Sequence, residues 1–107
     1  MRDDNKIFEY PTGVPLPPVH PGRTLASELA ARDMTANALA LRLRVAPNRL
    51  SEIVRGQRAI TAETALRLGR YFGTGAAFWV NLQARYDLAL AEREFGAQIA
   101  KEVDEAA

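Results

Sequence analysis

The chain has 107 residues, 48% of them hydrophobic, with one histidine, no cysteine and a formal net charge of +1. A chain of this length buries roughly 65% of its unfolded surface, which is enough for one domain without cross-links. The lack of cysteine excludes disulfide scaffolds and cysteine-ligated metal sites. Its apolar stretches are shorter than the ~20 residues of a membrane span, and residues 1–10 carry no secretion signal, so we expect a cytoplasmic protein without a membrane partner.

The charge is distributed unevenly along the chain. Residues 1–20 have a net charge of −1, residues 21–58 of +4, and residues 59–107 of −2. A basic segment between acidic ends indicates an anionic partner for the middle of the chain. The alternative is an ordinary solvated face that is rich in arginine.

Proline and the apolar spacing predict an all-α fold. Five of the six prolines lie within the first 21 residues, which favours an extended N-terminal arm over residues 1–20. The apolar spacing then becomes helical, and no stretch alternates as a strand does. The sequence predicts a domain over residues 21–95 and an acidic tail over 96–107. The expected helices span about 21–33, begin after Thr35, run from Pro47 to Gly56, run from Thr61 to Gly73 or Gly75, and extend from Ala76 into the nineties.

The second and third expected helices are short, and only about three residues, 44–46, separate them. This layout is typical of a helix-turn-helix. The outer face of the third helix carries residue types that read bases, because arginine pairs with guanine, asparagine with adenine and glutamate with cytosine. The base-reading candidates are Asn48, Arg49, Glu52 and Arg55, and the phosphate-binding candidates are Thr35, Asn37, Arg44, Ser51, Gln57 and Arg58. The alternative is a helical hairpin whose polar face is merely solvated.

Catalytic, metal and cofactor sites are not expected. The chain has no cysteine nucleophile, no glycine-rich phosphate loop, and no serine and carboxylate placed around His20. A metal site would need partners for this histidine at ligand spacing, and the sequence supplies none. We therefore expect His20 to have a structural role where the first helix begins.

The last expected helix is apolar on more than one side, which predicts a homodimer interface. The expected interface residues are Phe78, Trp79, Leu82, Tyr86 and Leu90. Their helical spacing favours packing over a cofactor pocket. The alternative is a monomer with a deeper core.

A family resemblance extends over residues 20–87. The run resembles the helix-turn-helix domains of the Cro and lambda-repressor (XRE) superfamily, and most closely its HigA (VapI-like) antitoxin branch. Its most specific part is residues 58–87, with Phe78-Trp79 and Asn81-Leu82-Gln83. The other matching residues are Val19-His20-Pro21-Gly22, Leu39-Ala40, the run 48–53, the run 56–61, the run 64–68 and the run 71–74.

The sequence departs from the family pattern at three positions. Arg44 stands where the family usually has glycine, so we expect either a left-handed arginine, at a cost of about 1 kcal/mol, or a turn of different shape. Ala46 replaces a serine that commonly caps the recognition helix, and Ala36 replaces a glutamine often placed on a phosphate. Fewer phosphate contacts follow, which Arg44 itself partly offsets if it reaches the DNA backbone.

The resemblance implies a dimeric antitoxin that binds double-stranded operator DNA. It also implies repression of a shared operon and neutralisation of a HigB-type toxin, an mRNA endonuclease of the RelE type. One alternative is a stand-alone transcription regulator of the XRE type without a toxin. The other is a protein-interaction module that has lost DNA binding.

Overall fold

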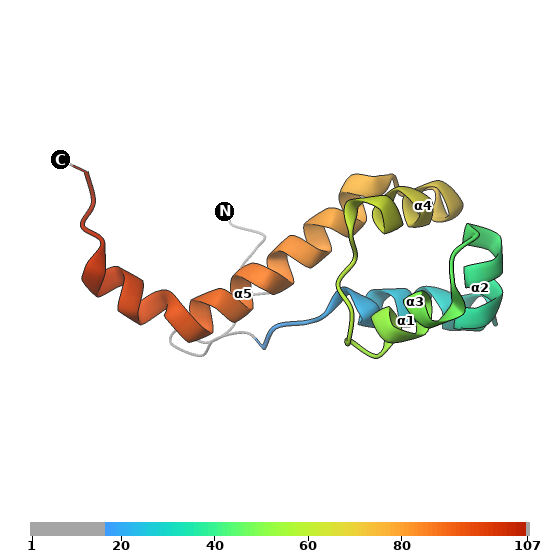
Figure 1. Ribbon diagram of the computed structural model, residues 1–107, viewed down its shortest axis with the longest axis horizontal. Helices are drawn as coiled ribbons and strands as arrows, with labels where there is room; N and C mark the ends of the chain where they lie inside the picture. The colour runs from blue at the N-terminus through green and yellow to red at the C-terminus, as the bar shows by residue number, and fades with distance from the viewer. Residues whose placement is uncertain (1–16, 107) are drawn as a thin grey trace, which may run out of the picture.

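The computed structural model describes residues 17–106, and within this range it contains five helices and no strand (Figure 1). The all-α prediction is therefore confirmed. The expected N-terminal arm lies almost entirely outside the described residues. None of the described helices is both long and apolar enough to cross a membrane. The helices are α1 Pro21–Ala31, α2 Ala36–Leu43, α3 Pro47–Val54, α4 Ala62–Phe72 and α5 Ala76–Glu102.

Side-chain caps define where three of these helices begin. Nδ1 of His20 accepts a hydrogen bond from the backbone N–H of Gly22 over 2.8 Å, at the start of α1. The hydroxyls of Thr35 and Thr61 accept bonds of 3.0 and 3.2 Å from first-turn N–H groups of α2 and α4. Such caps satisfy amides that have no partner within the helix. The predicted caps at Thr35 and Thr61 and the structural role of His20 are confirmed.

One apolar core joins the helices. α1 and α3 cross so closely that a Cβ built on Gly22 would lie 1.9 Å from the carbonyl oxygen of Ile53. Only glycine fits at this crossing. Trp79 of α5 is fully buried, and its indole N–H donates a 3.0 Å hydrogen bond to the hydroxyl of Thr74. The buried apolar residues are Leu25, Leu29, Leu39, Ala40, Leu43, Leu50, Ile53, Ile60, Ala65, Leu68 and Trp79.

α5 is the longest helix, and its second half projects away from the other four (Figure 1). Gly73 and Gly75 make the turn before it, with φ angles of 76° and 83°. The helix reaches Glu102, farther than expected, so part of the predicted acidic tail is helical. Alanine, glutamine, lysine and glutamate favour helix there, and the amide of Gln98 donates to the carboxylate of Glu102 one turn later.

Candidate nucleic-acid interface

The structure builds the predicted helix-turn-helix from α2 and α3. Leu50 and Ile53 are fully buried on the inner face of α3, and Val45 in the turn packs against the core. The N–H of Val45 donates to the carbonyl of Ala40 over 3.0 Å, which closes the end of α2. These contacts hold α3 from behind and leave its opposite face outward.

The turn between these helices has the left-handed residue that was one of the two expected outcomes. Arg44 has φ 63° and ψ 48°, a conformation in which residues other than glycine are strained by about 1 kcal/mol. Ala46 precedes α3, and its methyl group offers no acceptor to the first turn. Pro47 at the first helical position compensates in part, because its fixed φ suits a helix start and it has no N–H to satisfy.

Four polar residues lie on or beside the outer surface of α3. Asn48 and Arg55 are exposed, whereas Ser51 and Glu52 are half-buried. The hydroxyl of Ser51 donates to the carbonyl oxygen of Asn48 over 3.3 Å. Asn48 and Arg55 are thus the base-reading candidates with the most open side chains.

Glu52 is paired with a residue expected to contact phosphate. Its Oε1 atom lies 2.7 Å from Nη2 of Arg58 and accepts a 2.8 Å hydrogen bond from Nε. Nε of Arg55 also donates to the side chain of Gln57 over 3.4 Å. The pair between Glu52 and Arg58 connects α3 to the segment that follows it, residues 55–61, which we call the α3–α4 loop, and the bond between Arg55 and Gln57 lies within this loop. The structure therefore brings four of the sequence candidates together.

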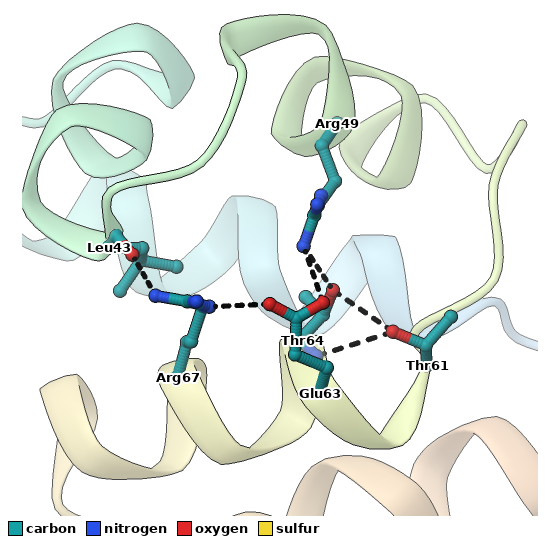
Figure 2. Close-up of polar contacts among 6 residues, drawn as sticks. All are labelled: Leu43, Arg49, Thr61, Glu63, Thr64 and Arg67. Carbon is teal, nitrogen blue, oxygen red and sulfur yellow. Dashed lines mark hydrogen bonds and ion pairs between the residues drawn. The ribbon is translucent and has the colours of Figure 1, made fainter.

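Arg49 does not lie on the outer face, which corrects the expectation from sequence. Figure 2 shows its guanidinium directed at the start of α4. Nη1 lies 3.3 Å from Oε1 of Glu63 and 3.4 Å from the hydroxyl of Thr64, and only 28% of the side chain is exposed. The carboxylate of Glu63 attracts the guanidinium to this side. Arg49 therefore links α3 to α4.

Glu63 also holds a second arginine, which the sequence reasoning missed. Nε of Arg67 donates to Oε2 of Glu63 over 3.0 Å, and Nη1 donates to the carbonyl of Leu43 over 2.9 Å (Figure 2). The hydrogen bond from Arg67, and next the charge of Arg49, lower the pKa of the Glu63 carboxyl below its usual value. Arg67 thereby supports the end of α2 from α4.

The remaining phosphate candidates come from three separate segments. Thr35 and Asn37 are exposed at the start of α2, Arg44 is exposed in the turn, and Gln57 and Arg58 are exposed in the α3–α4 loop. Three further arginines, which sequence spacing did not connect with the turn, surround Arg44 in an open hollow between α2 and α4. The hollow is lined by Arg42, Leu43, Arg44, Leu66, Arg67, Arg70 and Tyr71.

Known proteins of the same architecture are closely similar. A helix-turn-helix family model matches residues 25–79. Virulence-associated protein I of Dichelobacter nodosus is 52% identical over 80 residues, which are 74% of either chain. An addiction module antidote protein of the HigA family from Coxiella burnetii is 48% identical, with a TM-score of 0.84 over 85% of this chain and 100% of that one. The chain belongs to the HigA (VapI-like) antitoxin family.

A second member of the HigA family has been solved with DNA. Pseudomonas aeruginosa antitoxin HigA, in a structure with the higBA promoter, is 46% identical to this chain. Its TM-score is 0.82, over 85% of this chain and 100% of that one. The family is non-enzymatic, which confirms the expectation that this HigA-family chain is not an enzyme.

The dimer residues expected on α5 are only partly accessible in this HigA-family chain. Trp79 is fully buried in the core, so its assignment to an interface is wrong. Leu82 is half-buried, and Tyr86 packs edge-on against His20 with 4.9 Å between ring centroids. Phe78 and Leu90 are each 42% exposed. The spacing of these residues follows the side of α5 that faces the domain, and sequence alone did not say which side that was.

A different stripe of α5 is open. Leu88, Phe95 and Ile99 are 60%, 49% and 51% exposed, and their spacing of seven and four places them along one helix face. Phe95 and Ile99 lie on the second half of α5, beyond the domain, and Leu88 lies close to the middle of the helix. Ala91, Gly96 and Ala100 lie beside them and leave a shallow apolar hollow along this face.

Proposed function

We propose that this chain is an antitoxin that binds operator DNA as a dimer, represses its own toxin–antitoxin operon and neutralises a HigB-type mRNA endonuclease. One observation carries the proposal. α3 is held from behind by the fully buried Leu50 and Ile53, while Asn48 and Arg55 are exposed on its outer side. This arrangement suits a helix that enters the major groove.

The charge around α3 supports a DNA partner. Arg44, Arg55 and Arg58 are all exposed, on the turn before α3, at its end and on the loop after it. Phosphate contacts of this kind position a protein on the duplex, and base contacts specify the sequence. The relative from P. aeruginosa, which was solved with the higBA promoter, also supports a DNA partner.

A dimer fits the remaining exposed surface. Leu88, Phe95 and Ile99 form an apolar stripe on a helix that projects from the domain. Two such stripes pack against each other in a two-fold dimer and remove apolar surface from water. A two-fold pair of recognition helices reads half-sites that lie about 34 to 36 Å apart, or a multiple of this distance.

Binding to the DNA upstream of its own coding sequence tests the operator role. Fluorescence anisotropy compares the wild-type chain with Asn48→Ala, Arg55→Ala and the control Arg93→Ala, which removes an exposed charge from α5. We expect a complex that is weaker by about fivefold or more for the first two variants, because one good base contact contributes about 1–3 kcal/mol. The control leaves affinity unchanged. A wild-type chain that binds unrelated DNA of the same length equally well contradicts the operator role.

Toxin neutralisation needs its own experiment. Co-expression with the adjacent reading frame is expected to restore growth that the neighbour alone arrests, with both proteins purifying as one complex. If the chain binds the operator and the neighbouring reading frame is not toxic, the result supports the stand-alone transcription regulator. If the chain forms a complex with the neighbouring protein and does not bind the operator, the result supports the protein-interaction module.

A further inference from the structure

A buried amide ties α5 to the α3–α4 loop. Gln83 is only 8% exposed, and its Oε1 atom accepts a 2.8 Å hydrogen bond from the backbone N–H of Ile60. Its Nε2 atom donates to the carboxylate of Asp87 over 3.0 Å. The two bonds orient the amide, because a carboxylate needs the donor end and a backbone N–H needs the acceptor end.

A second contact holds the same loop one turn farther along α5. Tyr86 packs edge-on against the ring of His20, with the centroids 4.9 Å apart. His20 also lies against Gly56 of the loop, since a Cβ built on Gly56 would lie 3.7 Å from Cγ of His20. Gly56 has a φ of 76°, so the chain turns sharply here as it leaves α3. α5 therefore supports the loop near both of its ends.

The loop carries exposed polar groups between these two supports. Gln57 and Arg58 are exposed, and Arg58 pairs with Glu52 on α3. Ile60 is buried, so the backbone N–H that Gln83 accepts is withdrawn from water. A buried N–H without an acceptor costs free energy, and the loop would have to move to expose it. The position of Gln57 and Arg58 thus depends on a side chain of α5.

We propose that Gln83 is a positioning residue for operator binding: its amide holds the α3–α4 loop so that Gln57 and Arg58 reach phosphates beside the groove that α3 occupies. This inference rests on the proposed operator function and adds to it a specific link between the DNA-contacting loop and α5. Gln83 itself does not touch DNA. It is buried, and it acts through the backbone of Ile60.

Gln83→Leu tests the link, because the leucine side chain is similar in size to that of glutamine and has no hydrogen-bond acceptor. The matched control is Leu68→Val, a substitution on α4 that removes volume from the buried core and so lowers stability. It leaves the hydrogen bond between Gln83 and Ile60 intact. Amide hydrogen exchange is measured at Ile60 and at a core amide of α4. Operator affinity is measured between 50 and 200 mM salt, at a temperature where circular dichroism shows that every variant is folded.

In Gln83→Leu we expect faster exchange at Ile60 with little change in the core amide, and about tenfold weaker operator binding at low salt. The slope of log K against log salt becomes shallower by about 0.9 for each phosphate that the loop no longer neutralises. In Leu68→Val the slope stays at its wild-type value. The change in slope separates positioning from stability, since a general loss of stability does not remove particular phosphate contacts.

Three results overturn the inference. The first is unchanged exchange at Ile60 in Gln83→Leu, which removes the link itself. The second is weaker binding with an unchanged salt slope, which leaves Gln83 a structural role only. The third is a wild-type chain that does not prefer its promoter, which overturns the proposed function and the operator role of Gln83 together, whatever exchange at Ile60 shows.

Discussion

Arg67 closes the C-terminal end of α2 from a different helix. Its Nη1 atom donates to the carbonyl oxygen of Leu43 over 2.9 Å, and its Nε atom donates to Glu63 on α4. The last carbonyls of a helix have no partner within it, and a cation near them is favourable. The left-handed Arg44 follows directly, so Arg67 stabilises the chain just where α2 turns toward α3.

Arg67→Ala is expected to lower the free energy of unfolding by about 1 kcal/mol, since the side chain is partly exposed and its bonds are screened by water. For a domain of this size that corresponds to a fall of about 4–8 °C in Tm. Urea denaturation and calorimetry measure both. Arg70→Ala removes an exposed arginine three residues later on the same helix and should change stability by less than about 0.5 kcal/mol. Equal losses in the two variants would contradict this role of Arg67.

Arg44→Gly is expected to stabilise the fold. Glycine adopts the left-handed conformation without a Cβ clash, so the free energy of unfolding rises by about 0.5–1 kcal/mol. Arg44→Ala keeps the strain and removes the same charge, and its stability should stay near that of the wild type. If Arg44 contacts a phosphate, both variants lose this contact, and their affinity for the operator falls by the same factor. A glycine variant no more stable than the alanine variant would show that the turn is not strained.

His20 predicts a pH dependence of stability. Burial lowers the pKa of its ring below the ordinary 6.5, and a main-chain hydrogen bond with Arg58 and the charge of Asp87 only partly oppose this. Nδ1 accepts the N–H of Gly22, so the cap requires the neutral ring. The unfolded chain therefore binds its proton more readily than the folded one, and the contribution of the cap is complete above pH about 6.5.

This contribution is lost as the pH falls through the lower pKa of the folded state. Chemical denaturation between pH 7.5 and 5 should show a decline in stability for the wild type. His20→Asn keeps a capping oxygen and does not titrate, so its curve should be flat over the same range. Because His20 is the only histidine in the chain, an identical decline in the variant would assign the effect to other groups.

The open stripe on α5 predicts where dimerisation is disrupted. Phe95→Glu and Ile99→Glu place charges on half-exposed apolar positions beyond the domain, and each should convert the dimer to monomer in sedimentation or light-scattering measurements. Tm at a concentration where the wild type is monomeric should hardly change. Ala97→Glu adds the same charge on the opposite side of the helix and should leave the dimer intact. A wild-type chain that is monomeric at all concentrations would remove the dimer from the proposal.

Sequence predicts the local features of this fold well, because helix caps act over three or four residues. Thr35, Thr61 and Pro47 marked helix starts correctly. For Arg44 the sequence left two outcomes open, and the structure has the first of them, the left-handed conformation. The family resemblance covers residues 20–87, and its most specific part includes Phe78 and Trp79. The match to the helix-turn-helix family model and the similarity to a solved HigA-family structure confirm it.

The candidate site was harder to predict, since its side chains are oriented by distant partners. Arg49 has a helical position next to Asn48, but Glu63 and Thr64, fourteen and fifteen residues later, turn it toward α4. The spacing on α5 identified an apolar side and could not distinguish the side packed on the domain from the open one. Trp79 was assigned to an interface for that reason.

The close contact between Gly22 and the backbone of Ile53 means that different residues of the helix-turn-helix position α3 and face outward from it. The depth and angle of α3 are set from its inner side, by a glycine on α1 that tolerates no side chain and by buried leucine and isoleucine. The outward residues Asn48 and Arg55 take no part in that packing. A change of DNA sequence preference therefore requires substitutions only on the outer face of α3. Most variants from a library with substitutions at these outer positions should still fold.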